Sequence, residues 1–228
     1  MLSTNLHSWI SLVNAALRGR TAGRSLIKGW IARALLRRPG PLTIPPVPPQ
    51  QTRIGISGWT YGPWRGTFYP PKHPQKRELE FASRALTSIE INGTYYSTFK
   101  PDSWMKWRDE TPDGFVFALK AHRFTTHRRE LAGAAEGIQR FIGSGIAELG
   151  DKLGPIVWQL MPTKAFDAQD IDRFLALLPR EVAGRPLQHV LDARHPSFAC
   201  EGFAALAQRA GVAIAVIDAP DVRKIEIP

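Results

Sequence analysis

Short apolar runs alternate with segments of helical periodicity along most of the chain. Six runs have the length and apolar content of β-strands: residues 53–59, 88–96, 115–122, 155–160, 187–195 and 212–219. The spacing of apolar positions between them predicts helices over residues 76–87, 101–110, about 130–153, 167–179 and 201–211. Strands that alternate with helices are typical of a parallel sheet, because parallel neighbours need a crossover connection. The pattern therefore predicts an α/β fold.

Two parallel architectures compete, and the glycines that follow the first strand help to choose between them. A doubly wound sheet that binds a nucleotide usually carries a phosphate-binding glycine pattern at this place. Gly55, Gly58, Gly62 and Gly66 fit neither the GxGxxG nor the Walker spacing. We therefore expect a TIM-like parallel β/α barrel, incomplete because the pattern supplies about six of the eight strands.

Polar residues recur where the predicted strands end. They are Ser57, Glu90, Asn92, Lys120, His122, Gln159, Asp192, Arg194 and Asp218. Side chains two residues apart share one face of a strand, so Glu90 and Asn92 point the same way. Burying ionisable groups without partners costs several kcal/mol, which favours a shared polar centre. The alternative is a pair of structural ion pairs, Glu90 with Lys120 and Asp192 with Arg194, that tie the strands together and do no chemistry.

Composition indicates a folded chain and narrows the kinds of site that it can hold. Hydrophobic residues make up 43% and charged residues 22% of the 228 residues, enough for a real core. The single cysteine, Cys200, excludes an internal disulfide framework and a zinc site built from cysteines. The longest apolar runs are too short for a membrane-spanning helix. A cytoplasmic location is the expectation.

The net charge of +10 is distributed unevenly. Residues 1–53 hold eight Lys and Arg and no Asp or Glu, so this segment alone carries +8. The remaining 22 basic and 20 acidic side chains leave only +2 for residues 54–228. The excess charge therefore belongs to the N-terminal segment, and it gives no argument that the folded part binds nucleic acid.

The N-terminal segment, residues 1–52, reads as an appendage to the domain at 53–228. Residues 25–38 predict a basic amphipathic helix, which would touch an anionic membrane surface or a partner. The alternatives are a leader added by a wrongly assigned start codon and a tail without a role. Six prolines in residues 39–49 favour an extended conformation and separate this helix from the domain.

Five sequence motifs resemble those of one known family. They are GISGWTYGPWRGTFYP (55–70), EINGTYY (90–96), TPDGFVFALKAHRFTTH (111–127), WQLMP (158–162) and RHPSF (194–198). In that order they resemble the domain of unknown function 72 family, also called YecE-like. The resemblance implies a TIM-like barrel, and it brings no established reaction or cofactor.

The chain departs from the family pattern in two ways. Asp192 stands where the family usually has a glutamate, and its side chain is one methylene shorter. The family also continues with further strands beyond the position of Pro228, so we expect a barrel truncated at its C-terminus. The alternative is a dimer that closes the barrel.

The first functional hypothesis is an enzyme that acts on a phosphate- or carboxylate-bearing small molecule. Glu90 or Asp192 would serve as general base and His122 as a proton-transfer group. The expected substrate-binding residues are Asn92, Tyr95, Lys120, His127, Gln159 and Arg194. Lys120 and Arg194 would hold the anion, since Arg offers a bidentate fork and Lys a compact charge.

The cofactor stays open, and a divalent metal is a weaker hypothesis. Glu90, His122, Asp192 and Asp218 are ligand types that such ions use. No close-spaced ligand motif accompanies them, so no residue is assigned to a metal.

A second hypothesis is a non-catalytic protein that binds nucleic acid or a phosphorylated metabolite by charge and stacking. Its binding residues would be Lys120, Arg123, Arg128 and Arg129 with the aromatic side chains Trp59, Tyr61, Trp64, Tyr95 and Tyr96. A third is that the chain is an inactive fragment. The sequence leaves the oligomeric state open.

Overall fold

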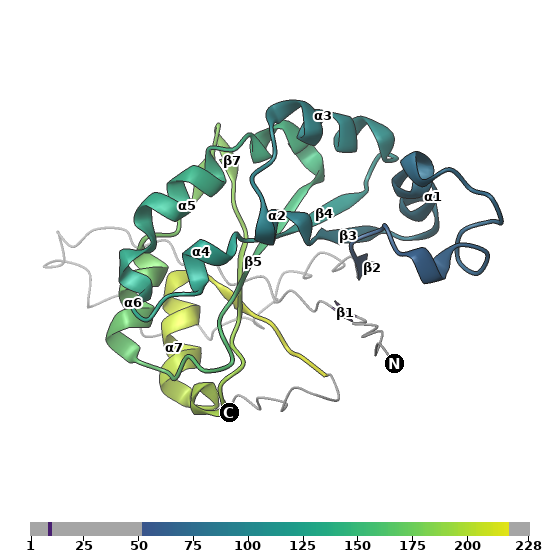
Figure 1. The fold of residues 1–228 in the computed structure, drawn as a ribbon. Helices are drawn as coiled ribbons and strands as arrows, with labels where there is room; N and C mark the ends of the chain where they lie inside the picture. Colours follow the sequence, from purple (N-terminus) through teal and green to yellow (C-terminus); the bar gives the residue numbers. More distant parts are fainter. Residues whose placement is uncertain (1–8, 11–51, 219–228) are drawn as a thin grey trace, which may run out of the picture.

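The computed structural model describes residues 9–10 and 52–218 (Figure 1). The sheet has the order β1-β2-β3-β4-β5-β8-β9. Six of its strands are parallel: β2 (Ile54–Ser57), β3 (Ser88–Ile91), β4 (Val116–Lys120), β5 (Leu153–Gln159), β8 (His189–Asp192) and β9 (Ala213–Ile214). β1 (Trp9–Ile10) pairs with β2 in the antiparallel sense. The helix predicted over residues 25–38 and the proline-rich stretch lie outside the described residues.

Helices follow the strands as the periodicity predicts. The α-helices are α1 (Glu78–Ala85), α2 (Gly93–Tyr96), α3 (Pro101–Glu110), α4 (Arg123–Thr126), α5 (Ala135–Ile142), α6 (Ala168–Ala176) and α7 (Glu201–Ala210). Short 3₁₀ turns are η1 (Gly62–Trp64), η2 (Gln75–Arg77), η3 (Leu131–Ala134), η4 (Ile146–Lys152) and η5 (Pro196–Phe198). A separate hairpin joins β6 (Glu181–Val182) to β7 (Arg185–Pro186).

The core lies between the sheet and the longer helices, which Figure 1 shows along one face of the sheet. Alternate strand residues turn toward these helices and are fully buried, among them Ile89, Phe117, Leu119, Ile156 and Trp158. The ring of Trp158 packs edge-on against Phe174 of α6, with ring centres 5.7 Å apart. The intervening residues of β4, Val116, Ala118 and Lys120, are only half-buried on the other face.

The parallel α/β fold is confirmed, and the strands are adjacent in chain order. The sheet is open in the described part of the chain, since β2 and β9 do not pair with each other. The structure therefore contains the six expected parallel strands, but not a closed barrel.

Three local elements differ from the prediction. Residues 93–96 form the helical turn α2 instead of continuing β3, because the Thr94 hydroxyl lies 2.6 Å from the carbonyl oxygens of both Ile91 and Lys120. The β6–β7 hairpin was not predicted, since Ala183 and Gly184 supply its positive-φ turn without an Asn or Asp. β9 is two residues long.

Helix ends follow the capping residues in the sequence. The Asp167 carboxylate accepts hydrogen bonds from the backbone N–H groups of Gln169 and Asp170, as expected of the residue that begins α6. Gly211 ends α7 in the left-handed conformation, which glycine adopts at low cost. Within residues 9–10 and 52–218, no helix combines the length and the apolar character needed to cross a membrane.

Candidate functional site

Three side chains at the carboxyl ends of β2 and β3 form a hydrogen-bonded network. Ser57 and Glu90 are register partners on these neighbouring strands, so their side chains point to the same face. The Ser57 hydroxyl donates to Oε1 of Glu90 at 3.0 Å, and Nδ2 of Asn92 donates to the Ser57 oxygen at 2.5 Å. Ser57 was expected at a strand end, but its hydrogen bonds to both Glu90 and Asn92 were not predicted.

Glu90 is buried, and its nearest cation is Lys120 at the end of β4. Nζ of Lys120 lies 4.0 Å from Oε1 of Glu90, and the two side chains are 16% and 8% exposed. Burial raises the pKa of the Glu90 carboxyl, and the negative charge of Asp192 raises it further. Lys120, the Ser57 hydroxyl and Arg194 oppose this shift in pKa. The net rise means that this carboxyl group holds its proton to a higher pH than an exposed glutamate does, as suits a group that transfers protons.

Asp192 and Arg194 form a bidentate ion pair where β8 ends. Nε and Nη2 of Arg194 lie 3.1 and 3.0 Å from the two oxygens of the Asp192 carboxylate. The Asp192 side chain is fully buried and that of Arg194 is 14% exposed. Asp192 is the last residue of β8, and Arg194 lies two residues beyond it, so the pair forms within one short stretch of chain. Its charges act on the pKa of Glu90, so the two acidic groups belong to one centre.

Gln159 ends β5 beside Asp192, its register partner on β8. The side-chain oxygens of Gln159 and Asn92 are buried, and neither accepts a hydrogen bond within the described structure. Buried polar atoms of this kind normally have a partner, protein or water. Both amide oxygens therefore have unused acceptor capacity at the strand ends.

Tyr95 and His127 extend the centre toward the surface. The Tyr95 hydroxyl lies 2.5 Å from Nε2 of His127, and Nζ of Lys120 lies 5.4 Å from the centre of the Tyr95 ring. Burial raises the pKa of Tyr95 and lowers that of His127. The imidazole is therefore largely neutral at pH 7, and one hydrogen bond joins it to the Tyr95 hydroxyl.

Tyr61, a residue of the loop after β2, also reaches this centre. Gly58, with φ of +78°, turns the chain so that the Tyr61 hydroxyl donates to the Ser57 carbonyl. Burial raises the pKa of Tyr61, while a hydrogen bond with Asn92 lowers it. Tyr61 was expected only among the stacking aromatic side chains, because a loop residue gives no periodic signal.

His122 lies at the rim instead of against the carboxylates. Nδ1 of His122 accepts a hydrogen bond from the backbone N–H of Phe124 at 3.3 Å, so His122 is the N-cap of α4. The His122 ring also forms a hydrogen bond with the backbone of Tyr96. Burial lowers the pKa of His122. None of the contacts described for His122 involves Glu90 or Asp192, so a direct relay between them is not formed here.

The proposed metal ligands do not come together. In the part of the chain that the structure describes, no three His, Cys, Asp or Glu side chains are grouped in a way that could hold a metal ion. Asp218 is exposed and lies four residues beyond the end of β9. The geometry gives the metal hypothesis no support.

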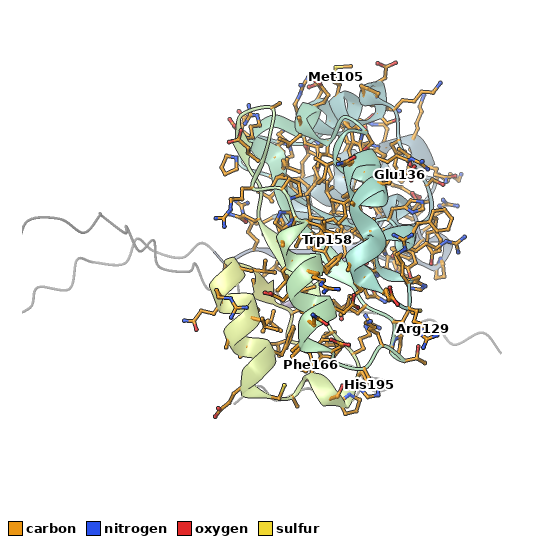
Figure 2. All side chains as sticks on the ribbon, turned by 90° about the vertical axis from the view of Figure 1, so that its left-hand side faces the viewer. Met105, Arg129, Glu136, Trp158, Phe166 and His195 are labelled. Atoms are coloured by element: carbon orange, nitrogen blue, oxygen red, sulfur yellow. The ribbon has the colours of Figure 1, made fainter. Side chains whose placement is uncertain are left out.

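The loop that carries His127 is fixed from outside the site. Both Asp170 oxygens accept backbone N–H groups, from Leu131 at 3.0 Å and Ala132 at 2.9 Å. Nζ of Lys164 bonds to Asp170 and to the Arg129 carbonyl, each at 2.6 Å. In Figure 2, Arg129, Phe166 and His195 lie toward one end of the molecule, and Met105 lies at the other. The loops after β4, β5 and β8, which carry these three residues, therefore extend toward the same end of the molecule.

A cavity of about 590 Å³ lies elsewhere, where the strands begin, and is lined in part by Arg108, Asp113, Val116 and Lys152. Nζ of Lys152 is engaged by the carbonyls of Arg108 and Thr111, each at 2.5 Å, where α3 ends. The Lys152 ammonium group in this cavity is thus used to hold the end of α3. At the strand ends, by contrast, acidic, basic and amide side chains come together. We take the strand ends as the candidate site.

The protein is of the parallel α/β class, and it has a buried polar centre at the carboxyl ends of its strands. In this class of protein, ligands usually bind at that edge of the sheet. The model of the family "Protein of unknown function DUF72" matches residues 53–228. The chain belongs to this family, and the resemblance carried by the five motifs is thereby confirmed.

Two relatives of known sequence are similar over part of the chain. The UPF0759 protein YecE of Escherichia coli (strain K12) is 26% identical over 152 residues, 65% of this chain and 50% of that protein. The UPF0759 protein YunF of Bacillus subtilis (strain 168) is 31% identical over 77 residues, 33% of this chain and 26% of YunF. The matched region thus spans about half the length of YecE.

Two crystal structures of DUF72 family proteins share the fold. The protein from Thermotoga maritima is 20% identical, with a TM-score of 0.59 over 75% of this chain and 66% of that one. The protein from Enterococcus faecalis is 17% identical, with a TM-score of 0.58 over 77% of this chain and 64% of that one. At this level of identity the likeness concerns the fold alone.

Proposed function

We propose that this protein is an enzyme that acts on an anionic small molecule bound at the strand-end centre. The observation that carries the proposal is the buried Glu90 carboxyl, held by Ser57 and Lys120 beside the Asp192–Arg194 pair. Perturbed acidic groups with specific charged partners are typical of functional sites. A phosphate or carboxylate group is the ligand chemistry that Lys120 and Arg194 favour.

Each residue has a distinct role in this proposal. Glu90 is the general acid–base group of the proposed reaction, because burial raises its pKa. Lys120 and Arg194 hold the anion. Asp192 orients the Arg194 guanidinium through two hydrogen bonds. Asn92, Gln159 and the Tyr95–His127 pair contact the polar groups of the substrate, while His122 shapes the rim.

The proposal includes a barrel-like architecture, with residues 53–228 as the domain. Supporting it are six adjacent parallel strands in chain order and a polar centre at their carboxyl ends. A crystal structure of a longer family member in which further strands join β9 to β2 would agree with this proposal. A sheet that stays open in such a relative would contradict it.

Replacing Glu90 by Gln tests the catalytic proposal. We expect the variant to lose turnover by about 100-fold or more, since positioned acid–base groups contribute that much. The assay follows a panel of phosphate- and carboxylate-bearing metabolites by NMR for chemical change. Glu136→Gln is the matched control, because Glu136 is 84% exposed in α5 and pairs only with Arg140 among its described ion pairs. Unchanged turnover in Glu90→Gln would remove Glu90 from the mechanism.

The alternative is a protein that binds the same anion without transforming it. Calorimetry tests the anion site itself, because Lys120→Ala weakens binding in either case, and the NMR assay for chemical change separates the two. A metabolite that binds but never reacts would favour the binding protein. If no anion binds and Lys120→Ala changes only stability, then the two ion pairs serve the structure alone.

A further inference from the structure

Two exposed aromatic side chains stand at the rim of the strand-end centre. Tyr96 is 65% exposed and Phe124 is 64% exposed, so neither belongs to the core. They lie in α2 and α4, the short helices that follow the neighbouring strands β3 and β4 (Figure 1). His122 connects them, since its ring centre lies 4.8 Å from that of Phe124 and its ring bonds to the backbone of Tyr96.

This rim is continuous with the polar centre. The ring of Tyr96 packs edge-on against Tyr95, with centres 4.9 Å apart. Tyr95 in turn lies under Nζ of Lys120, which pairs with Glu90. A ligand that contacts Lys120 therefore has an aromatic surface within reach on its outer side.

The rim also carries positive charge. The Arg123 guanidinium lies 5.5 Å from the centre of the Phe124 ring. Single exposed aromatic side chains need no explanation. Two of them that flank one imidazole, beside an arginine and next to a buried charged centre, form the combination that stacks a flat ring while holding an anion.

We propose that the rim of Tyr96, His122, Arg123 and Phe124 stacks a planar aromatic ring of the ligand, while the anionic group of the same ligand lies against Lys120 and Arg194. This inference rests on the proposed function and narrows its substrate class to small anions that bear an aromatic ring. Nucleoside monophosphates and aryl carboxylates share that chemistry.

Calorimetry with the full chain tests the ring by paired ligands. Adenosine monophosphate is compared with ribose phosphate, and indole acetate with acetate. Within each pair the anionic group is kept and the ring is removed. We expect the ring-bearing member of at least one pair to bind roughly tenfold tighter, since stacking on aromatic side chains contributes about that much. The pair that shows the difference identifies the source, nucleotide or aryl carboxylate.

A double variant, Tyr96→Ala with Phe124→Ala, locates the effect. It should bring the affinity of the ring-bearing ligand down to that of its ring-free partner and leave the ring-free partner unchanged. Phe124→Leu, which keeps an apolar side chain but no ring face, should lose part of the difference. Ile54→Ala is the matched control, because Ile54 is 67% exposed but begins β2 at the opposite end of the strands.

The outcomes separate the two proposals. Ring-free anions that bind as tightly as ring-bearing ones, in the native chain and in the double variant, overturn the stacking inference and leave the anion site standing. Loss of the ring effect in Ile54→Ala as well would also overturn it, since the effect would not come from the rim. If no ligand of either pair binds, both this inference and the proposed anion site are wrong.

Discussion

At the scale of single residues, Glu90 is held between opposing influences. Burial raises its pKa, while Lys120 and Ser57 stabilise the ionised form. Because the net shift is upward, the folded state binds the proton more tightly than the unfolded chain does. The ionised carboxylate therefore lowers stability, and this cost grows as the pH rises from the ordinary pKa of a glutamate through the raised one.

Glu90→Gln, which mimics the protonated side chain, should therefore stabilise the protein at pH 7 to 8. A change of about 1 kcal/mol would move the melting temperature by about 2–4 °C in a domain of this size. The gain should shrink as the pH falls toward 4.5, where Glu90 itself takes up the proton. Thermal melts of both proteins across this range measure the difference. A variant that is less stable at every pH would contradict the upward shift.

His189 predicts a second pH effect, away from the site. Its Nδ1 accepts from Nε1 of Trp158 at 3.0 Å, and its Nε2 lies 2.7 Å from the Pro179 carbonyl, so the neutral ring satisfies both contacts. Burial lowers the pKa of His189 below its ordinary value of 6.5. Below pH 6.5 His189 therefore binds a proton more readily in the unfolded chain than in the folded protein.

Stability should consequently fall as the pH drops below 6.5 and level off once the lowered pKa is passed. Urea unfolding between pH 8 and 5 measures the slope. His189→Gln is expected to be less stable at pH 8, because the packing against Trp158 changes, but to lose less stability on acidification. An equally steep loss in the variant would assign the slope to other groups.

The site was predictable in part from such residues. The period of two places Asp192 and Arg194 on one face, and strand adjacency brings Glu90 to Lys120. The position of His122 was not predictable, because β4 ends at Lys120 and the His122 side chain caps the N-terminus of α4. The contact between Tyr61 and Asn92 depends on the turn at Gly58, which apolar spacing does not encode.

At the scale of elements, the close approach of β4 and β5 depends on Gly154. A Cβ added there would lie 2.4 Å from Cγ1 of Val116 and 2.7 Å from the Phe117 carbonyl oxygen. The register between the two strands also shifts between Phe117 and Leu119. No side chain fits between the strands without moving backbone.

Gly154→Ala should therefore destabilise the protein by about 1–3 kcal/mol, the usual cost of overpacking. Gly62→Ala is the control, because a Cβ at Gly62 meets nothing within 4 Å and Gly62 has no positive φ. Urea unfolding of the two variants gives the comparison. Equal stability of the two variants would show that β4 and β5 accommodate the added methyl group without a cost in free energy.

The elements themselves were largely predictable, and α2 shows one reason why some were not. Strands and longer helices follow from apolar spacing, and Asp167 marked the start of α6. The turn at α2 depends instead on Thr94, whose hydroxyl bonds to a carbonyl of the neighbouring strand β4. Contacts between segments far apart in sequence leave no local pattern, so such turns escape a reading of the sequence.

At the scale of the whole molecule, the described core is one continuous cluster that runs from Tyr69 to Val212. It includes Trp104 and Trp158, both fully buried. A single core predicts a single cooperative unfolding transition. Thermal melts followed by far-ultraviolet and near-ultraviolet circular dichroism should therefore coincide, with the mass monitored by light scattering. An earlier loss of the near-ultraviolet signal would mean that the tryptophan packing fails before the sheet.

The polar centre draws its side chains from Ser57 through Arg194, one uninterrupted part of the sequence. β9, which comes later, adds pairing to the sheet, and none of the contacts described for the centre comes from it. In evolutionary terms, one contiguous stretch of the gene encodes the whole centre. Recombination that keeps this stretch intact would carry all of these polar side chains together, and the proposed function with them.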